Sequence, residues 1–218
     1  MKLYCGNCFD VIKEQNLRAN IAFTSPPYNR KRNDKYTNYD DTIDDYYAFL
    51  VDATNVLMDV CDKYVIMNLQ ANFYNKKDVY KYMGHFADKI QNVIVWEKSN
   101  PLPANGFNIT NAYELFILIG NEPIKSNRTY TKNHITTAVN SATTTKLHKA
   151  VMKQEVADWF IETFTKSEDI VIDPFMGLGT TGISCQKYGR DFVGIEKDGQ
   201  YFEIAKGRIQ SVESEENK

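Results

Sequence analysis

The sequence has no uncharged apolar run that approaches the roughly 20 residues of a membrane-spanning helix. Its first residues, MKLYCGNCFDVI, are interrupted by polar side chains too early to form the apolar region of a signal peptide. We therefore expect a soluble, cytoplasmic protein that does not associate with a membrane.

Cysteine is scarce, and the net charge is small. The 4 cysteines are too few and too scattered for a disulfide framework, and Cys5 and Cys8 have no second pair that would complete a zinc site. Redox pairs of this spacing normally follow a strand and cap a helix, so we expect reduced thiols and no redox role for a pair so near the N-terminus. A net charge of -2 excludes nucleic-acid binding through bulk positive charge, but not through a local basic cluster.

The length and the apolar content predict one domain over residues 1–218, because 218 residues with 43% hydrophobic side chains suffice for one well-buried core. Short β-rich apolar runs alternate with helical patterns, which predicts an α/β fold with a mostly parallel sheet and helices on both faces. The apolar runs cover residues 20–23, 63–69, 92–98, 113–120, 169–173 and 191–196, and the helical patterns begin near 41 or 42, cover 152–163, begin near 180 and cover 201–209.

A glycine-rich segment near the C-terminus predicts a ligand site. A strand runs into Asp173, Gly177 and Gly179 follow, and the next strand ends at Glu196. Ligands of open α/β sheets bind at the carboxyl ends of strands, and glycines let the backbone approach them closely. A carboxylate at the end of the next strand can accept hydrogen bonds from both ribose hydroxyls. The segment therefore suits an adenosine-like ligand.

Two cofactors fit this pattern. Gly177 to Gly182 match GxGxxG, so an NAD-dependent oxidoreductase is one reading. Asp173 opposes it, because its carboxylate lies where the anionic pyrophosphate of a dinucleotide would pass. The same carboxylate suits S-adenosylmethionine, which carries an ammonium and a sulfonium.

The motifs DPFMGLGTT, with GIE downstream, and TSPPYN resemble the amino-group DNA methyltransferases in their permuted β-class order, with the catalytic motif first and the cofactor loop last. The resemblance covers nearly the whole chain, including WEKSNPLP and the segment 146–161, although His148 is followed by Lys149 and not by the commoner proline. It implies a Rossmann-like S-adenosylmethionine-dependent methyltransferase fold. The cofactor-binding residues that it implies are Asp173, Pro174, Phe175, Gly177, Gly179, Thr180, Glu196 and His148.

The chemistry of an exocyclic amine explains the residue types in TSPPYN. The amine is a poor nucleophile, so acceptors must draw its hydrogens until the nitrogen lone pair points at the sulfonium methyl group. Ser25 and the carbonyl of Pro26 suit this task, while Pro26 and Pro27 stiffen the turn and offer no competing N–H. Tyr28 can stack on a base extruded from the duplex. We expect no metal, since His85, His134 and His148 form no convincing ligand cluster.

The target base follows less directly from the motif. Family members with serine at the first motif position resemble N4-cytosine enzymes more often, so we expect transfer to cytosine N4. Adenine N6 is the alternative, because TSPPYN also occurs in adenine-type sequences. A protein that binds DNA without turnover is a further alternative.

Two segments are candidates for DNA contacts. Lysine, arginine and amide side chains cluster in 29–41 and in 122–145, and the second segment could be a small target-recognition insertion. Both segments are short, and the resemblance implies double-stranded DNA as the partner while admitting a homodimer and a cognate restriction endonuclease. The residues concerned are Asn29, Lys31, Arg32, Lys125, Arg128 and Lys132.

Overall fold

The computed structural model describes residues 1–29, 41–101, 103, 109–138 and 152–216, without the side chains of 213–216. Eight strands form one sheet in the order β1-β8-β7-β2-β3-β5-β4-β6. All neighbouring strands are parallel except at the two contacts of β5, so the expected mostly parallel α/β sheet is confirmed. The strands are β1 Lys2–Cys5, β2 Ala19–Thr24, β3 Cys61–Leu69, β4 Ile90–Lys98, β5 Tyr113–Ile119, β6 His134–Thr137, β7 Ile170–Asp173 and β8 Asp191–Glu196.

Six of these strands coincide with the six apolar runs of the sequence, because strands with two covered faces read as continuous apolar segments. The other two, β1 and β6, are four residues long and lie at the two edges of the sheet. Their short, partly polar sequences KLYC and HITT carry too little pattern to predict a strand.

The helices differ from the expected ones mainly at their starts. Helix α2 begins at Tyr46 and not near 41 or 42, because the Asp45 side chain caps it by accepting from the N–H of Ala48 at 2.9 Å. Helix α4 begins at Gln154, so Met152 lies outside it. Two helices, α1 and α3, were not expected. The six helices of the described ranges are α1 Cys8–Glu14, α2 Tyr46–Val60, α3 Lys76–His85, α4 Gln154–Phe164, α5 Thr180–Lys187 and α6 Gly199–Glu216.

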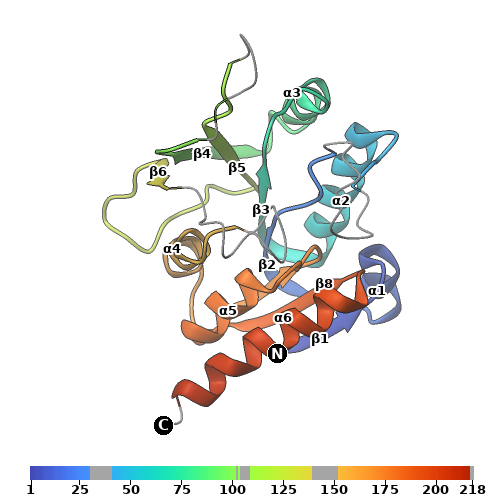
Figure 1. Cartoon of the computed structure of the whole chain (residues 1–218), viewed down its shortest axis with the longest axis vertical. Coiled ribbons are helices and arrows are strands. Elements are labelled where there is room, and N and C mark those ends of the chain that lie inside the picture. The colour runs from blue at the N-terminus through green and yellow to red at the C-terminus, as the bar shows by residue number, and fades with distance from the viewer. Residues whose placement is uncertain (30–40, 102, 104–108, 139–151, 217–218) are drawn as a thin grey trace.

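The helices cover both faces of the sheet, as expected, and make a three-layer molecule (Figure 1). Buried residues of α1, α2 and α3 share one apolar cluster, and those of α4, α5 and α6 share another. Alternate side chains of each strand enter opposite clusters. In β3, for example, Val65 and Met67 pack in the first and Ile66 in the second. Across the described ranges, none of the helices is both long and apolar enough to traverse a membrane.

The connections reverse direction between β2 and β7. From β2 the chain passes through α2 to β3 on one side, and from β7 it passes through α5 to β8 on the other. The two connecting helices lie on opposite faces, so the carboxyl ends of β2 and β7 border a topological switch point, where open α/β sheets bind their ligands. The two predicted motifs follow these two strands.

Candidate functional site

The loop after β7, residues 173–179, depends on glycine at two positions. Gly177 has φ 53° and Gly179 has φ 80°, in the left-handed region that side chains disfavour. A Cβ built on Gly177 would meet no atom nearer than the Phe175 carbonyl at 4.0 Å, so this side of the loop is open. A Cβ on Gly179 would press on Ile209 of α6 at 3.0 Å. Gly177 therefore leaves room for a ligand, and Gly179 lets the loop pack on α6.

Glu196 ends β8 beside this loop. Its Oε2 accepts from the Gly177 N–H at 2.8 Å and its Oε1 accepts from the Asp198 N–H at 2.9 Å. Burial raises the pKa of the Glu196 carboxyl, and the nearby Asp173 charge raises it further against these two hydrogen bonds. Each oxygen keeps a second lone pair, so the carboxylate can still accept from hydroxyl groups of a ligand.

Asp173 is 4% exposed and links three elements. Its Oδ1 accepts from Thr24 Oγ1 at 2.6 Å and from the Phe175 N–H at 3.1 Å, and its Oδ2 accepts from Thr181 Oγ1 at 2.7 Å. Burial raises the pKa of this carboxyl, although the three hydrogen bonds act against that rise. The side chain thus ties the end of β2 to β7 and to the first turn of α5.

The other residues predicted to bind the cofactor lie close in the chain to these two carboxylates. Pro174 is buried, and the partly exposed ring of Phe175 lies 5.7 Å from that of Phe49 on α2. Thr180 is the first residue of α5 and is 8% exposed. His148 lies outside the described residues. The structure therefore brings together all the predicted cofactor-binding residues that it describes.

The loop after β2, residues 24–29, has its backbone held by side chains from α2 and from the segment before α3. The carbonyl of Pro27 accepts from the Tyr46 hydroxyl at 2.7 Å. The carbonyl of Tyr28 accepts from Asn75 Nδ2 at 2.7 Å and from Asn72 Nδ2 at 3.1 Å. Among the described residues, none donates a hydrogen bond to the carbonyl of Pro26. This oxygen can therefore accept a hydrogen bond from a ligand.

Tyr28 is 7% exposed, and its hydroxyl lies among polar groups. The hydroxyl oxygen is 2.6 Å from Asn68 Oδ1, 2.8 Å from Glu114 Oε2 and 2.9 Å from Ser25 Oγ. The ring face expected to stack on a flipped base is mostly covered in this structure. The described side-chain hydrogen bonds of Tyr28 use its hydroxyl.

Asn68, Lys98 and Glu114 form what we call the strand cluster, beneath the loop after β2. Asn68 on β3 is fully buried, Glu114 on β5 is 5% exposed, and Lys98 at the end of β4 pairs with Glu114. The sequence analysis gave these residues no role. A signal was present, because Asn68 and Glu114 interrupt the apolar runs YVIMNL and YELFILI, and buried polar residues of this kind are uncommon.

The strand cluster also decides how the Ser25 hydroxyl can act. Tyr28 has one hydroxyl hydrogen, which it donates either to Asn68 Oδ1 or to Glu114 Oε2. In both cases Ser25 can donate its own to Asn68 Oδ1 at 3.1 Å. Because this hydrogen points at Asn68, Ser25 Oγ presents its lone pairs to the site. Ser25 is partly exposed and can therefore accept a hydrogen bond from a ligand.

The first group of predicted DNA contacts lies next to this loop. Asn29 is 3% exposed with φ 47°, and its side chain donates to the Ile43 carbonyl at 2.9 Å and accepts from the Ile43 N–H at 3.2 Å. Its described contacts thus hold the backbone before α2 and do not face solvent. Lys31 and Arg32 lie outside the described residues.

The second group lies between the end of β5 and the start of β6, on the side of the sheet where the parallel strands begin, which we call the far edge. Strand β5 runs antiparallel to β3 and ends at Ile119 opposite Val65, so the residues after it emerge far from the ends of β2 and β7. Arg128 forms an ion pair with Glu162, and its guanidinium lies 6.0 Å from the ring centre of Trp159 on α4. Lys125 and Lys132 are exposed. The structure does not bring these three cations to the two loops.

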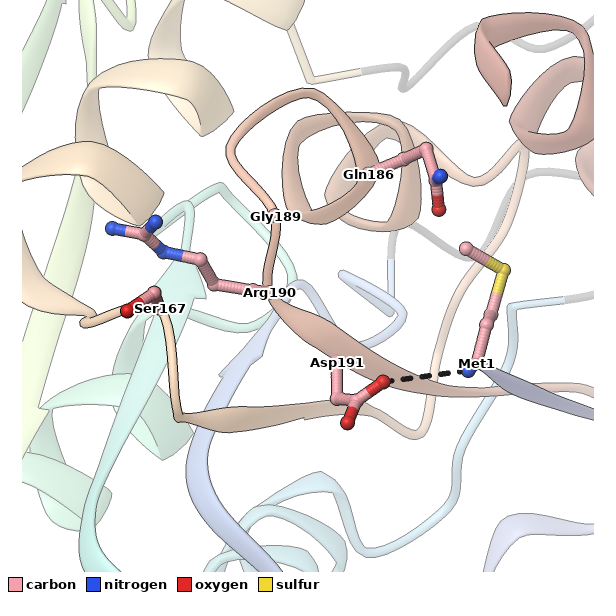
Figure 2. A pocket seen from close by; sticks show the side chains of 6 residues that line it. All are labelled: Met1, Ser167, Gln186, Gly189, Arg190 and Asp191. Atoms are coloured by element: carbon pink, nitrogen blue, oxygen red, sulfur yellow. Dashed lines mark hydrogen bonds and ion pairs between the residues drawn. The ribbon is translucent and has the colours of Figure 1, made fainter. Parts of the chain in front are cut away.

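A hollow at this far edge is also remote from the loops. Figure 2 shows that it lies where β7 and β8 begin, with the Met1 amino group 3.5 Å from Asp191 Oδ1. Ligands of open α/β sheets bind at the opposite ends of the strands, so this hollow is no candidate for the main ligand site. Its lining residues are Met1, Ser167, Gln186, Gly189, Arg190 and Asp191.

The argument from position against a redox role for Cys5 and Cys8 was wrong. Cys5 ends strand β1 and Cys8 begins helix α1, so the pair does follow a strand and precede a helix. Burial nevertheless raises the pKa of the Cys8 thiol to about 11, which disfavours the reactive thiolate. The chemistry of Cys8 and not its place in the chain supports an unreactive thiol.

Comparison with known proteins finds a family that contains both loops. The DNA methylase family of the N6/N4 methyltransferase type matches residues 19–207. Among characterised proteins, the chain is 24% identical to the type II methyltransferase M.HinfI of Haemophilus influenzae, and the match covers 97% of this chain and 69% of that protein.

Solved structures share the fold. The M1.HpyAVI complex with S-adenosylmethionine has a TM-score of 0.70 at 23% identity, covering 95% of this chain and 98% of that one. The cytosine-N4-specific PvuII DNA methyltransferase has a TM-score of 0.76 at 15% identity, covering 99% and 90%. At these identities the likeness concerns the fold alone.

Proposed function

The chain belongs to the DNA methylase family, whose members depend on S-adenosylmethionine, and we propose that it methylates the exocyclic amine of a base turned out of double-stranded DNA, with cytosine N4 as the acceptor. One observation carries the proposal. The 2.6 Å hydrogen bond from Thr24 to Asp173 joins the start of the TSPPYN motif to the start of the glycine loop at the switch point of the sheet. A methyl donor and an acceptor amine held by the two loops would therefore be neighbours.

The residues after β7 and β8 fit the cofactor. The open side of Gly177 admits a close ligand, Glu196 offers lone pairs for ribose hydroxyls, and Asp173 and Glu196 together place negative charge near a cationic molecule. When bound, S-adenosylmethionine supplies the methyl group as a substituent of its sulfonium. We assign its binding to the loop 173–179 with Glu196.

The residues after β2 fit the acceptor. Ser25 Oγ and the Pro26 carbonyl would each accept one hydrogen of the exocyclic amine, which draws the nitrogen lone pair out of conjugation with the ring. Transfer would form a nitrogen–carbon bond as the sulfur–carbon bond of the bound donor breaks, leaving a thioether, and the proton that the nitrogen loses would pass to water. The two acceptors can stay in position because side chains from α2 and the segment before α3 hold the carbonyls of Pro27 and Tyr28 in the same loop.

The choice of cytosine N4 rests on Ser25 at the first position of the motif, which is the residue more often found in cytosine-type sequences. Adenine N6 methylation would correct this choice and leave the rest of the proposal intact. The single domain over 1–218, target recognition by 122–145, a homodimer and a cognate endonuclease stay predictions from the sequence and its resemblance.

A methyl-transfer assay on purified protein tests the proposal. The protein is incubated with methyl-labelled S-adenosylmethionine and duplex DNA or RNA, and the product is digested and its methylated nucleoside identified. We expect N4-methylcytosine from duplex DNA. Binding of cofactor and DNA without any methylated product would establish a binding protein, and tight NADH binding without S-adenosylmethionine binding would establish an oxidoreductase.

A further inference from the structure

The segment between β3 and α3 exposes two aromatic rings beside the loop after β2. Phe73 is 81% exposed and Tyr74 is 53% exposed, and their rings meet edge to face with centroids 5.3 Å apart. Large exposed aromatic side chains on a folded backbone are typical of surfaces that bind a partner. Among the described residues, nothing covers most of the Phe73 ring.

The backbone of this segment is tightly tied, so the exposure of Phe73 does not come from a frayed loop. Asn75 Oδ1 accepts from the Asn72 N–H at 2.7 Å, and Asn72 Oδ1 accepts from the N–H groups of Tyr74 at 2.8 Å and Asn75 at 3.2 Å. Both asparagines also donate to the Tyr28 carbonyl. The backbone that carries the two exposed rings is therefore held against the loop proposed to bind the acceptor base.

Helix α3 continues this surface with positive charge. Lys76 and Lys77 begin the helix and are exposed, and Tyr80 and Lys81 follow about one turn later, also exposed. Asp78 is the acid in this first turn and is only partly exposed. Three exposed lysines interleaved with aromatic rings are the composition of a nucleic-acid contact. In Figure 1, α3 lies beyond the end of β3, at the top of the view.

We propose that Phe73 stacks on a base of the locally opened duplex while Lys76 and Lys77 contact the flanking phosphates. This inference rests on the proposed function and adds a stacking residue that the sequence analysis did not find. Tyr28, the aromatic residue expected to stack, is 7% exposed, whereas Phe73 presents an open ring tied to the same backbone. A stacked Phe73 would fill the space that an extruded base leaves and so favour extrusion.

A substitution at Phe73 tests the stacking, measured as equilibrium binding of labelled duplex DNA in the presence of S-adenosylhomocysteine. Phe73→Ala should weaken DNA binding about tenfold, Phe73→Trp should restore it, and the affinity for S-adenosylhomocysteine should stay within about twofold. Tyr188→Ala is the control, since it removes a partly exposed ring just after α5, away from both loops, and should leave DNA binding unchanged.

A mismatch at the target base separates stacking from a general structural role. The mismatch lowers the cost of opening the duplex, so the loss caused by Phe73→Ala should shrink on mismatched DNA. An equal loss on both duplexes, or no loss on either, would overturn the proposed stacking. Because binding is measured without turnover, this result stands apart from whether the wild-type protein transfers a methyl group.

The lysines are tested by salt dependence. The double variant Lys76→Gln/Lys77→Gln should reduce the slope of log affinity against log salt concentration by about one to two. The control is Lys13→Gln/Lys166→Gln, which removes two exposed lysines, one in the last turn of α1 and one before β7, and should leave the slope unchanged. Equal slopes for wild type and the first variant, or an equal change in both variants, would overturn the phosphate contacts.

Discussion

The two loops at the switch point lie side by side but are held in different ways. The loop after β7 is held mostly within its own unit of β7, α5 and β8, because Asp173 bonds Phe175 and Thr181 and Glu196 bonds Gly177, although Asp173 also bonds Thr24 of β2. The loop after β2 is held by Tyr46, Asn75 and the strand cluster, which lie 19 to 86 residues away.

This difference teaches which part of a site a sequence can reveal. A loop that is fixed locally keeps its pattern of glycine and carboxylate within one short segment. A loop that is fixed by distant strands shows only its own residues, and its supports appear once the sheet order is known. The predictions below test this contrast, starting with the largest expected effect.

Removal of Asp173 should affect the loop after β7 most. Asp173→Ala leaves the hydroxyls of Thr24 and Thr181 without a buried acceptor, so we expect the free energy of unfolding to fall by about 2–4 kcal/mol and S-adenosylmethionine binding to be lost. Urea denaturation and calorimetric titration measure the two quantities. Asp88→Ala, at an exposed position, is the control and should change neither. An unchanged free energy of unfolding for Asp173→Ala would contradict the conclusion that this carboxyl ties β2 to β7 and α5.

Disruption of the strand cluster should affect the loop after β2 alone. Glu114→Gln weakens the acceptor of the Tyr28 hydroxyl and removes the charge that pairs with Lys98, so the Ser25 hydroxyl is positioned less precisely. We expect the rate of methyl transfer to fall about tenfold while the affinity for S-adenosylmethionine stays within about twofold. Single-turnover kinetics measure the rate.

The matched control for this variant is Glu97→Gln on strand β4, because Glu97 is half exposed and hydrogen-bonds Thr136 at the edge of the sheet. It should change neither quantity. A Glu114 variant that loses cofactor affinity and rate together would contradict the separation of the two loops.

The affinity for the cofactor should depend on pH through the loop after β7. Burial raises the pKa of Asp173 and Glu196, and a cationic ligand favours the ionised carboxylates, so affinity should rise as pH increases through these raised values. Titration of S-adenosylmethionine between about pH 5 and about pH 8 should show a severalfold increase. Glu196→Gln should flatten this rise, and a rise of the same size in this variant would exclude Glu196 as its source.

The smallest effect is expected at the far edge. Arg128→Ala removes an exposed ion pair with Glu162, which contributes only about 0–1 kcal/mol to stability, and lies away from both loops. We expect DNA binding and methyl transfer to stay within about twofold of wild type. A loss of DNA affinity as large as that of the Lys76→Gln/Lys77→Gln variant would place the DNA contact at this edge, as the sequence analysis predicted.

The central strands could be predicted because each is apolar on both faces. The start of α2 could not, since the hydrogen bonds between Asn29 and Ile43 hold the backbone before Asp45 and are invisible in the helical spacing. Helix α3 was missed because only Val79 and Tyr82 of its ten residues are buried, which leaves no apolar face to detect.

The resemblance to amino-group DNA methyltransferases is confirmed by the family match, which spans both motifs. The residues that hold the TSPPYN loop could not be predicted. Asn68 and Glu114 are far apart in the sequence and become neighbours only because β3 pairs with β5. The composition of 122–145 predicts DNA contacts for the cations at 125, 128 and 132. The antiparallel direction of β5, which the composition does not reveal, leads the chain to the far edge before these residues.

The most direct test of the account is the Ser25→Ala variant, measured for cofactor affinity and for single-turnover methyl transfer to duplex DNA on the same preparation. The account predicts that the affinity for S-adenosylmethionine stays within about twofold and that the transfer rate falls about 100-fold, because only the amine loses its acceptor. Transfer at the wild-type rate, or a parallel loss of cofactor binding, would contradict the assignment of one loop to the amine and the other to the cofactor.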